Sequence, residues 1–517
     1  MLENPKYQKL AQHFKYDAGV LAKYDIQVQG LKCDTLLASY LLDPASSHKL
    51  DSLALKYLNH RMISYEEVVK KNQAASFAEV PLTEACIYSA EDADVTFRLG
   101  EIFLKKLQEE ELTKVLFELE QPLARVLLKM ENWGVKVDVK FLQDLQKEFG
   151  DKMVAKEKRI YELAGEEFNI QSPKQLGVIL FEKLKLPVQK KTKTGFSTDV
   201  SVLTALSQEH DLPREILDFR SLAKLKATYV DALIQIADPK THRVHTHYNQ
   251  TIAETGRLSS TDPNLQNIPI RSDDGAKIRQ AFIAEAGYCL LSADYSQIEL
   301  RVLAQLSQDE VLLKAFKNNE DIHRMTASSI FGTPEDTVTP EMRASGKTVN
   351  FAVIYGQTAF GLSTQLGVSQ KEAKVYIDEY FKKYAGVKSY RDRVLADARK
   401  SGEVRTLMGR RRFVPELNSK NFGARSNAER IAFNTVIQGT AADIIKMAML
   451  EIDQALESEG LQSRMLLQVH DELVFEAKNS ELKDLRQIVA KKMEGAVDFD
   501  VHLKVEMGSG ANWREAH

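Results

Sequence analysis

A histidine and two acids interrupt an otherwise apolar run near residue 470, in the sequence LLQVHDELVF. The residues on either side, 465–469 and 473–477, are rich in the branched and aromatic types that favour strands. We therefore expect a tight hairpin with His470, Asp471 and Glu472 at its tip. Buried charge at such a tip is unfavourable unless something compensates it. The alternative is a solvated turn that simply uses polar residues.

A further acid, Asp294, follows the apolar run 288–293, which is typical of a short buried strand. A helical spacing of apolar residues begins at Ile298, so Asp294 falls where the predicted strand ends. If both strands belong to one sheet, Asp294 and Asp471 meet at its edge. Two such carboxylates repel each other. We expect a divalent cation, Mg²⁺, to compensate them, because it prefers oxygen ligands.

A helix is predicted between residues 339 and 356, with a threonine cap, a proline in first position and a glycine stop. Two cations and then two aromatic residues follow one another at intervals of four on it: Arg343, Lys347, Phe351 and Tyr355. Cations in the first half of a helix oppose its dipole, which makes sense if they and the backbone amides hold an anion. A triphosphate fits, with the rings stacked on its base. The alternative is an exposed basic stripe with two core aromatic residues.

A third row lies on the apolar segment SNAERIAFNTVIQGTAADIIKMAML, where Arg430, Asn434 and Gln438 are also four residues apart. They present three hydrogen-bonding groups on one side of a predicted helix. The minor groove of DNA offers acceptors at every base pair and little sequence information. The row therefore suits a protein that holds any DNA terminus equally well. The alternative is a polar row that is hydrogen-bonded within the protein.

Composition sets limits on these interpretations. The chain has 517 residues and a formal net charge of −3, so it is long enough for several domains and lacks an overall basic signature. Its three cysteines, Cys33, Cys86 and Cys289, are far apart, which argues against a zinc site or a disulfide framework and suits a reducing, cytoplasmic compartment. No apolar run is long enough to span a membrane, and we expect no membrane partner.

Several motifs in order resemble the bacterial members of the family A DNA polymerases. The sequences DYSQIELR at 294–301, the helix from Arg343 to Tyr355, and QVHDELVFE at 468–476 are similar to the three polymerase motifs of that family. The sequences TGRLSSTDPNLQNIP, DIHR and GSGANW are also similar to it. The resemblance runs from near residue 13 to the C-terminus. It implies a template-directed DNA polymerase of replication and repair, nucleoid-associated in the cytoplasm and monomeric, with primer-template DNA and deoxynucleoside triphosphates as partners.

The same resemblance implies roles for the acids. Asp294 and Asp471 would bind two Mg²⁺ ions together with the Tyr295 carbonyl, while Glu472 lies close by in support. One ion would activate the primer 3′-hydroxyl and the other would stabilise the leaving pyrophosphate. Lys347 would contact the triphosphate and protonate the departing group.

Further roles are implied for the residues around the acids. Glu299 is similar to a steric gate that crowds a ribose 2′-hydroxyl. The implied nucleotide contacts are Arg343, Lys347, His323 and Gln297 to the triphosphate, and Phe351 and Tyr355 to the sugar and base. The implied primer-template contacts are Arg257, Arg430, Asn434, Gln438 and His470.

The N-terminal part resembles only a portion of the family's 3′-5′ exonuclease domain. The sequence FKYD, ending at Asp17, and YSAED, from Tyr88 to Asp92, are similar to its second and third motifs. The first motif, an Asp-x-Glu pair, would fall before Met1. With two of four metal-binding carboxylates missing, we expect a truncated exonuclease-like domain that does not proofread.

The implied fold class is multidomain α/β. A right-hand polymerase, with an antiparallel palm sheet and helical thumb and fingers, would follow a partial ribonuclease-H-like exonuclease domain. The expected boundaries are 1–115 for the exonuclease-like domain, 116–240 for the thumb, 241–315 and 428–517 for the palm, and 316–427 for the fingers. A catalytically silent primer-template binding subunit on the same fold is the alternative, and the presence of Asp294 and Asp471 favours the enzyme.

Overall fold

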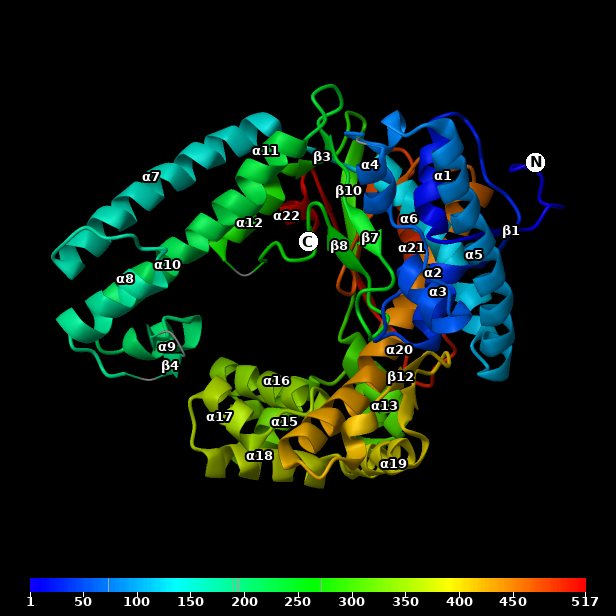
Figure 1. The fold of residues 1–517 in the computed structure, drawn as a ribbon. Helices are drawn as coiled ribbons and strands as arrows, with labels where there is room; N and C mark the ends of the chain where they lie inside the picture. The colour runs from blue at the N-terminus through cyan, green and yellow to red at the C-terminus, as the bar shows by residue number, and fades with distance from the viewer. Residues whose placement is uncertain (73, 189, 193–194, 271) are drawn as a thin grey trace.

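A four-stranded antiparallel sheet forms the centre of the computed structural model, which describes residues 1–517 except 73, 189, 193–194 and 271 (Figure 1). The strand order is β13–β14–β10–β15, with bounds Arg464–Val469, Glu472–Lys478, Tyr288–Tyr295 and Val505–Gly510. Strand β10 pairs with β14 so that Asp294 lies opposite Glu472. The prediction that both acid-bearing strands belong to one sheet is therefore confirmed.

The two faces of this sheet are both covered, which explains why its strands read as nearly continuous apolar runs. On β10, Leu291, Ala293 and Tyr295 belong to one buried cluster, and Leu290 belongs to another. The first cluster includes the helices α6 (Gln121–Trp133), α13 (Ile298–Ser307), α20 (Phe422–Ser458) and α21 (Leu482–Glu494). The second includes α12 (Asp273–Gln280) and α22 (Trp513–Ala516).

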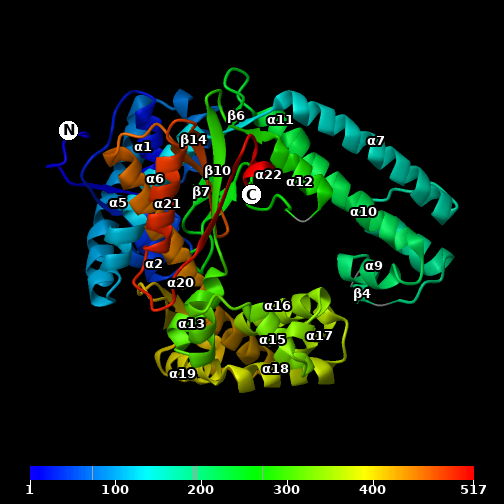
Figure 2. The same ribbon diagram turned by 180° about the vertical axis from the view of Figure 1, so that it is seen from behind.

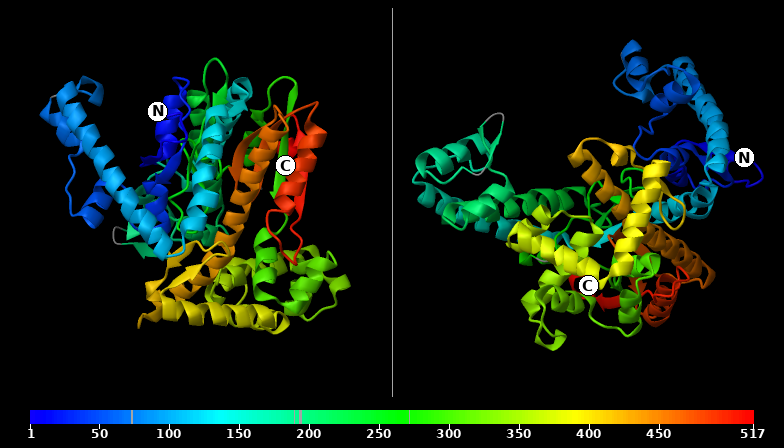
Figure 3. Two further views of the ribbon diagram at one scale, coloured as in Figure 1. Left: turned by 90° about the vertical axis from the view of Figure 1, so that its right-hand side faces the viewer. Right: turned by 90° about the horizontal axis from the view of Figure 1, so that it is seen from below.

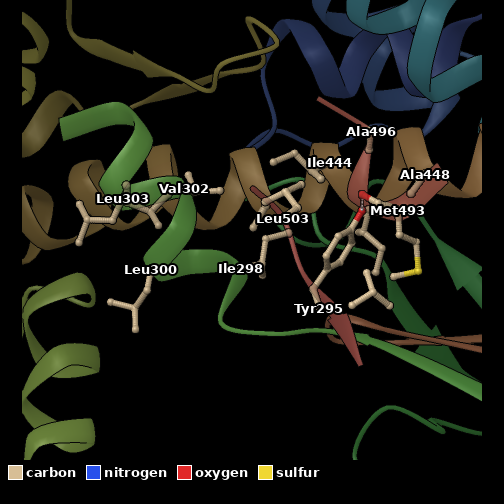
Figure 4. Packing of buried hydrophobic residues seen from close by; sticks show 14 of the residues in the cluster. Tyr295, Ile298, Leu300, Val302, Leu303, Ile444, Ala448, Met493, Ala496 and Leu503 are labelled. Carbon is tan, nitrogen blue, oxygen red and sulfur yellow. Dashed lines mark hydrogen bonds between the residues drawn. The ribbon is translucent and has the colours of Figure 1, made fainter. Parts of the chain in front are cut away.

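The first cluster fixes the end of β10 that carries Asp294. Figure 4 shows Tyr295 and Ile298 lying among residues of α20, α21 and the segment before β15, including Ile444, Met493 and Leu503. The Tyr295 hydroxyl donates a hydrogen bond of 2.7 Å to the carbonyl oxygen of Met493. Asp294 is thus held next to a fully packed residue, and its backbone position is set by the core.

Two helical arms extend from the same side of the sheet (Figure 1). The upper arm contains α7 (Val139–Ala164), α8 (Pro173–Gly177), α9 (Val200–Leu206), α10 (Asp211–Leu225), α11 (Ala232–Ile236) and the short strands β4 (Lys191–Thr192) and β5 (Gly195–Phe196). The lower arm contains α14 (Glu310–Lys317), α15 (Ile322–Phe331), α16 (Pro340–Ile354), α17 (Ala359–Leu366), α18 (Gln370–Lys383) and α19 (Ala385–Ser401). The rear view in Figure 2 shows α7, α10 and α15–α18 on the side of the sheet away from α21, with α19 below α13 and α20.

Small sheets and hairpins join these parts. The strands β3 (Val135–Val137), β6 (Arg243–Val244) and β9 (Phe282–Ile283) form a three-stranded sheet at the base of the upper arm. Two further hairpins are β7 (His247–Asn249) with β8 (Ser259–Thr261), and β11 (Glu403–Arg405) with β12 (Arg411–Phe413). The loop after β7 carries Arg257, which is half-buried. The loop after β11 carries Arg410, which is buried.

The N-terminal region packs on the opposite side of the molecule from the upper arm (Figure 3). Its parallel strands are β1 (Lys9–Ala11) and β2 (Leu31–Asp34), and its helices are α1 (Phe14–Ala22), α2 (Thr35–Leu42), α3 (Leu50–Leu58), α4 (Tyr65–Lys71) and α5 (Leu82–Glu109). It has its own apolar cluster, which Met447 and Leu450 of α20 also contact. Among the helices in the described ranges, none is both long and apolar enough to cross a membrane.

Four charged side chains are buried together where the start of α6, the loop after β11 and α20 meet. Glu120 accepts hydrogen bonds from Lys446, at 2.7 Å, and from Arg410. Arg410 also pairs with Asp443, at 2.8 Å. Burial alone would raise the pKa of Glu120, but Lys446 and Arg410 outweigh it and lower this pKa to about 2. These four residues, Glu120, Arg410, Asp443 and Lys446, are called the buried charge cluster below.

Candidate functional site

The two predicted acids meet at one end of the central sheet. Strands β13 and β14 are joined by a two-residue turn, His470 and Asp471, and His470 has the positive φ of 53° that such turns use. The Tyr295 N–H, at the end of β10, donates a hydrogen bond of 3.2 Å to the carbonyl oxygen of Asp471. Asp294, Tyr295 and Asp471 are therefore neighbours, as the hairpin interpretation required. The difference is that Glu472 is the first residue of β14 and is not in the turn.

The carboxylates of Asp294, Asp471 and Glu472 repel one another at this end of the sheet. Burial, together with the charges of Asp471 and Glu472, raises the pKa of Asp294 to about 7. Burial also raises the pKa of Asp471. Within the described ranges, no three His, Cys, Asp or Glu side chains form a complete metal cage. Two carboxylates beside a backbone carbonyl nevertheless fit Mg²⁺, which usually takes one or two carboxylates and completes its shell with substrate phosphates and water.

Glu472 is held by hydrogen bonds that direct its carboxylate away from free solvent. Its Oε1 accepts from the Ser292 hydroxyl at 2.6 Å and from the Trp513 indole N–H at 2.9 Å. Arg279 and His517 lie at 3.6 Å and 3.4 Å from its carboxylate oxygens. Burial would raise the pKa of Glu472, but the bonds from His517, Ser292 and Trp513 lower it. Glu472 thus stays ionised beside the two other acids and adds to the negative charge there.

A cavity of about 440 Å³ opens next to Asp471, between the sheet and the lower arm. Most of the residues predicted to bind a nucleotide line it, together with two predicted DNA contacts. Its polar and aromatic lining comprises Arg257, Gln297, Glu299, His323, Lys347, Phe351, Tyr355, His470 and Asp471. These residues come from five separate segments of the chain. The cavity therefore joins Lys347 and Phe351 of α16, and the Tyr355 ring at its end, to the acid in the hairpin turn.

Helix α16 begins where it was predicted to begin, and it ends close to its predicted end. The Thr339 hydroxyl accepts from the Met342 N–H at 3.3 Å, and Pro340 is the first helical residue. The helix ends at Ile354, so Tyr355 caps it and is not inside it. The Phe351 and Tyr355 rings lie 5.9 Å apart, centroid to centroid. Lys347, Phe351 and Tyr355 of the predicted row thus lie along the wall of the cavity.

Arg343, the first residue of that row, is not among the residues that line the cavity. Its Nε donates to Asp321 Oδ2 at 2.6 Å, and Asp321 is also the cap of α15. The same acid therefore fixes the start of α15 and holds Arg343 close to His323. Burial, Lys347 and Arg343 together lower the pKa of His323 to about 4.

Glu299 lies in the wall of the cavity and is almost fully buried, at 5% exposure. Arg257 donates to its Oε1 at 2.6 Å, and Tyr355 and Gln438 lie beside the carboxyl. Burial raises the pKa of Glu299, and Arg257 opposes this rise. Among the described residues, buried oxygens of Gln297, Glu299 and Asn434 have no hydrogen-bond partner. Such orphaned polar atoms are typical of a site that a ligand completes.

The third predicted row is on the accessible side of α20. Arg430 is exposed and Asn434 and Gln438 are half-buried, whereas most of their neighbours in the helix are buried. None of the three is among the residues that line the cavity. Arg430 Nη2 donates to Asn427 Oδ1 at 2.7 Å, and Gly356, just beyond α16, packs against Arg430. The row therefore begins beside the end of α16 and continues toward Glu299.

The residues similar to exonuclease motifs share a second cavity, of about 750 Å³, in the N-terminal region. Asp17 of α1 and Tyr88 and Asp92 of α5 line it, as does Asp51 of α3. Burial raises the pKa of both Asp17 and Asp92, and Glu91 adds to the effect on Asp92. The structure thus brings the motif residues together.

Sequence reasoning missed several residues of the site. The buried charge cluster has a recognisable signal in α20, where Asp443 and Lys446 stand three apart in an otherwise apolar run, but nothing near them indicates Glu120 or Arg410 as partners. The ion pair between Arg257 and Glu299 joins residues 42 positions apart. Asn350, buried next to His323, is one polar residue on an apolar helix face and gives no signal by itself.

Comparison with known proteins places these observations in a family. The family model for DNA polymerase family A matches residues 139–515, and that for a 3′-5′ exonuclease matches residues 1–108. Proteins named DNA polymerase I from Pseudomonas aeruginosa and Bacillus subtilis are 49% and 46% identical over 100% of this chain. The chain covers 57% and 58% of their lengths, so it spans somewhat more than half of each relative.

A solved structure is similar over the whole chain. It is described as the POL domain of Pol1 from M. smegmatis in complex with DNA primer-template and dNTP, and it is 41% identical with a TM-score of 0.90. The alignment covers 100% of this chain and 88% of that one. The predicted fold class, a right-hand polymerase preceded by an exonuclease-like domain, is confirmed.

Proposed function

Because this chain belongs to DNA polymerase family A, we propose that it is a template-directed DNA polymerase that adds deoxynucleotides to a primer 3′-hydroxyl. The observation that carries this proposal is the meeting of Asp294 and Asp471 at the sheet edge, beside the nucleotide-sized cavity lined by Lys347, Phe351 and Tyr355. Its partners would be primer-template DNA and deoxynucleoside triphosphates. It would act as a monomer at the nucleoid in the cytoplasm, in DNA replication and repair.

The proposed metal site consists of Asp294, Asp471 and the Tyr295 carbonyl, with two Mg²⁺ ions as cofactors. When bound, these ions would activate the primer hydroxyl and stabilise the leaving pyrophosphate. The charge at this end of the sheet supports the assignment, because burial and the neighbouring charges of Asp471 and Glu472 together raise the pKa of Asp294. Glu472, fixed by Ser292 and Trp513, supports the site without needing to be a ligand.

The proposed nucleotide site is the 440 Å³ cavity. Lys347 and His323, with Gln297, would contact the triphosphate, and Arg343 would reach it from its pair with Asp321. Phe351 and Tyr355 would pack on the sugar and base, and Lys347 would supply a proton to the leaving group. Arg257, His470 and the row Arg430, Asn434 and Gln438 would hold the primer-template. We further propose that the upper and lower arms are the thumb and the fingers.

Primer extension tests the proposal against the silent binding subunit. A labelled primer is annealed to four templates that differ in the first unpaired base, and each is incubated with the chain, Mg²⁺ and one deoxynucleotide at a time. We expect extension only where the nucleotide complements the template. Binding of the primer-template without extension in any of the sixteen combinations would support the silent subunit instead.

Lys347→Ala is expected to raise the KM for the incoming nucleotide by about 10- to 100-fold, with a smaller effect on primer-template affinity. The reason is the loss of charge-assisted bonds to the triphosphate, which are worth about 1.5–3 kcal/mol each. Steady-state kinetics over a range of nucleotide concentrations measure this change. Lys374→Ala, at an exposed position of α18, is the matched control. Equal kinetics in the two variants would contradict the role of Lys347.

Glu299→Ala is expected to reduce discrimination against ribonucleotides by about 10- to 100-fold, because removal of a steric clash changes specificity more than chemistry. The buried position of Glu299 beside Tyr355 supports this expectation. Competition between a ribonucleotide and its deoxy counterpart at one template position measures the ratio of kcat/KM values. Glu310→Ala, at an exposed acid on the next helix, controls for loss of charge. A Glu299 variant as selective as the parent would refute the gate.

We propose that the N-terminal region does not proofread in this chain. Asp17 and Asp92 are the motif acids at its cavity, and residues 1–115 contain no Asp-x-Glu sequence that would complete a two-metal set. We expect a primer with a mismatched 3′ end to stay intact when incubated with the chain and Mg²⁺ in the absence of nucleotides. Gel analysis of the labelled primer tests this. Shortened products that disappear in Asp17→Ala would show that this region is an active exonuclease.

A further inference from the structure

Four buried polar side chains form a continuous chain of hydrogen bonds inside the lower arm. Tyr384, between α18 and α19, bonds through its hydroxyl to the Thr326 hydroxyl of α15 at 3.0 Å. The Thr326 hydroxyl donates to Asn350 Oδ1 of α16 at 3.0 Å. Asn350 Nδ2 in turn lies 3.0 Å from Nδ1 of His323. All four residues are at most 3% exposed, and His323 lines the nucleotide cavity.

The direction of these bonds determines where the proton of His323 lies. Because an amide nitrogen only donates, this orientation of Asn350 makes Nδ1 of His323 an acceptor without a proton. The Thr326 hydroxyl donates to Oδ1 and thereby holds the amide in this orientation. A neutral imidazole with a bare Nδ1 carries its proton on Nε2. Nε2–H is then the ring group that remains free to donate to a ligand in the cavity.

The residues around the His323 ring keep the ring neutral and fix its position. The charged groups that face it are Lys347 and Arg343 from α16 and Asp321 from the start of α15. Burial and the two cations outweigh Asp321, so the His323 pKa falls well below neutrality. A β-carbon on Gly346 would lie 2.3 Å from the carbonyl oxygen of His323, so glycine is what lets α16 approach α15 this closely. The centroid of the Phe351 ring lies 6.1 Å from the centroid of the His323 ring.

We propose that Asn350 is a positioning residue that holds His323 as an Nε2–H donor toward an oxygen of the incoming triphosphate. This inference rests on the proposed function for its ligand, but the protonation of His323 is a property of the free chain. A neutral donor suits this place, because Lys347 and Arg343 already supply positive charge beside it. An imidazole with its proton on Nδ1 would instead present a bare nitrogen to the phosphate oxygens and repel them.

Asn350→Asp separates this role from a merely structural one. The carboxylate is close in shape to the amide and still accepts from Thr326, but it cannot donate to Nδ1. NMR of the free chain with isotopically labelled histidine reports which ring nitrogen is protonated, and His323→Ala identifies the signal. We expect a proton on Nε2 alone in the parent chain and a proton on Nδ1 in Asn350→Asp. Asn169→Asp, the same change at an exposed position where the side chain accepts from Gln171, should leave the signal unchanged.

Steady-state kinetics provide a second test of the proposal. Asn350→Asp should raise the nucleotide KM about tenfold, the effect of losing roughly one hydrogen bond to a charged group, with a smaller change in kcat. The same change made in a His323→Ala background should add little, because Asn350 is proposed to act through His323. If Asn350→Asp does not fold, Thr326→Val removes the donor that orients the amide, and the NMR signal should then show a mixture of both protonation sites.

Two results would overturn the proposal. One is a proton on Nδ1 of His323 in the parent chain. The other is an effect of Asn350→Asp on KM that is equally large with and without His323. A chain that fails to extend primers while the NMR result holds would count against the proposed function alone, since the assignment of the proton does not depend on turnover.

Discussion

Asp471→Ala is expected to lower the rate of nucleotide incorporation by about 10³-fold or more, because metal ions contribute several kcal/mol to such reactions and each ~1.4 kcal/mol is a factor of ten. The same change should leave primer-template affinity within a few-fold, since Asp471 would bind a metal and not the DNA backbone. Single-turnover extension gives the rate, and fluorescence anisotropy of labelled primer-template gives the affinity.

The control for this prediction is Asp498→Ala, which removes an acid from an exposed position outside the sheet. It should leave both quantities unchanged. Near-normal turnover of Asp471→Ala would remove the basis for the two-metal assignment. A parallel loss of DNA affinity would instead indicate that the hairpin turn positions the primer-template.

Glu120→Ala is expected to lower the free energy of unfolding by about 3–5 kcal/mol, because it leaves Arg410 and Lys446 buried without their shared counter-charge. Urea denaturation followed by circular dichroism measures the change. The matched control is Glu118→Ala, two residues earlier, where an exposed acid pairs with Lys114 at 4.0 Å. Exposed pairs contribute about 0–1 kcal/mol, so the control should remain close to the parent. Equal effects of the two substitutions would contradict the role of the buried charge cluster.

The same residue predicts a pH dependence of stability. The pKa of Glu120 is about 2 in the folded protein, below its usual 4.5. Its contribution is therefore fully present above about pH 4.5 and is lost as the pH falls toward 2. Glu120→Gln should remove this part of the acid sensitivity, so that its difference in unfolding free energy from the parent shrinks between pH 5 and pH 2. A difference that stays constant over this range would mean that Glu120 is not the titrating group.

Parts of the site that depend on a single helix or hairpin could be predicted from the residues of that segment alone. The caps and periodicity of residues 339–356 predicted α16 to within two residues of its end, and the branched and aromatic residues on either side of His470 predicted the hairpin. These predictions succeeded because a cap, a stop or a tight turn is decided by neighbours in the chain. The pairing of Asp294 with the hairpin needed only that two apolar strands share a sheet.

Contacts between distant segments could not be predicted in the same way. Nothing near Glu120 indicates that Arg410 and Lys446 will surround it, and nothing near Arg343 indicates its pair with Asp321. Glu472 was expected in the turn, but tertiary bonds from Ser292 and Trp513 hold it as the first residue of β14. These positions depend on how the helices pack. Roles for individual residues came largely from the resemblance to the family and not from spacing.

The central claim is that Asp294 and Asp471 together hold two metal ions at the sheet edge. Crystals of the chain with primer-template, a non-hydrolysable deoxynucleotide and Mn²⁺ in place of Mg²⁺ test it directly, because Mn²⁺ is located by its anomalous scattering. We predict two anomalous peaks bound by Asp294 and Asp471, and none when Asp471 is replaced by alanine. Peaks that are absent from this edge in the parent complex, or that persist unchanged in Asp471→Ala, would contradict the account.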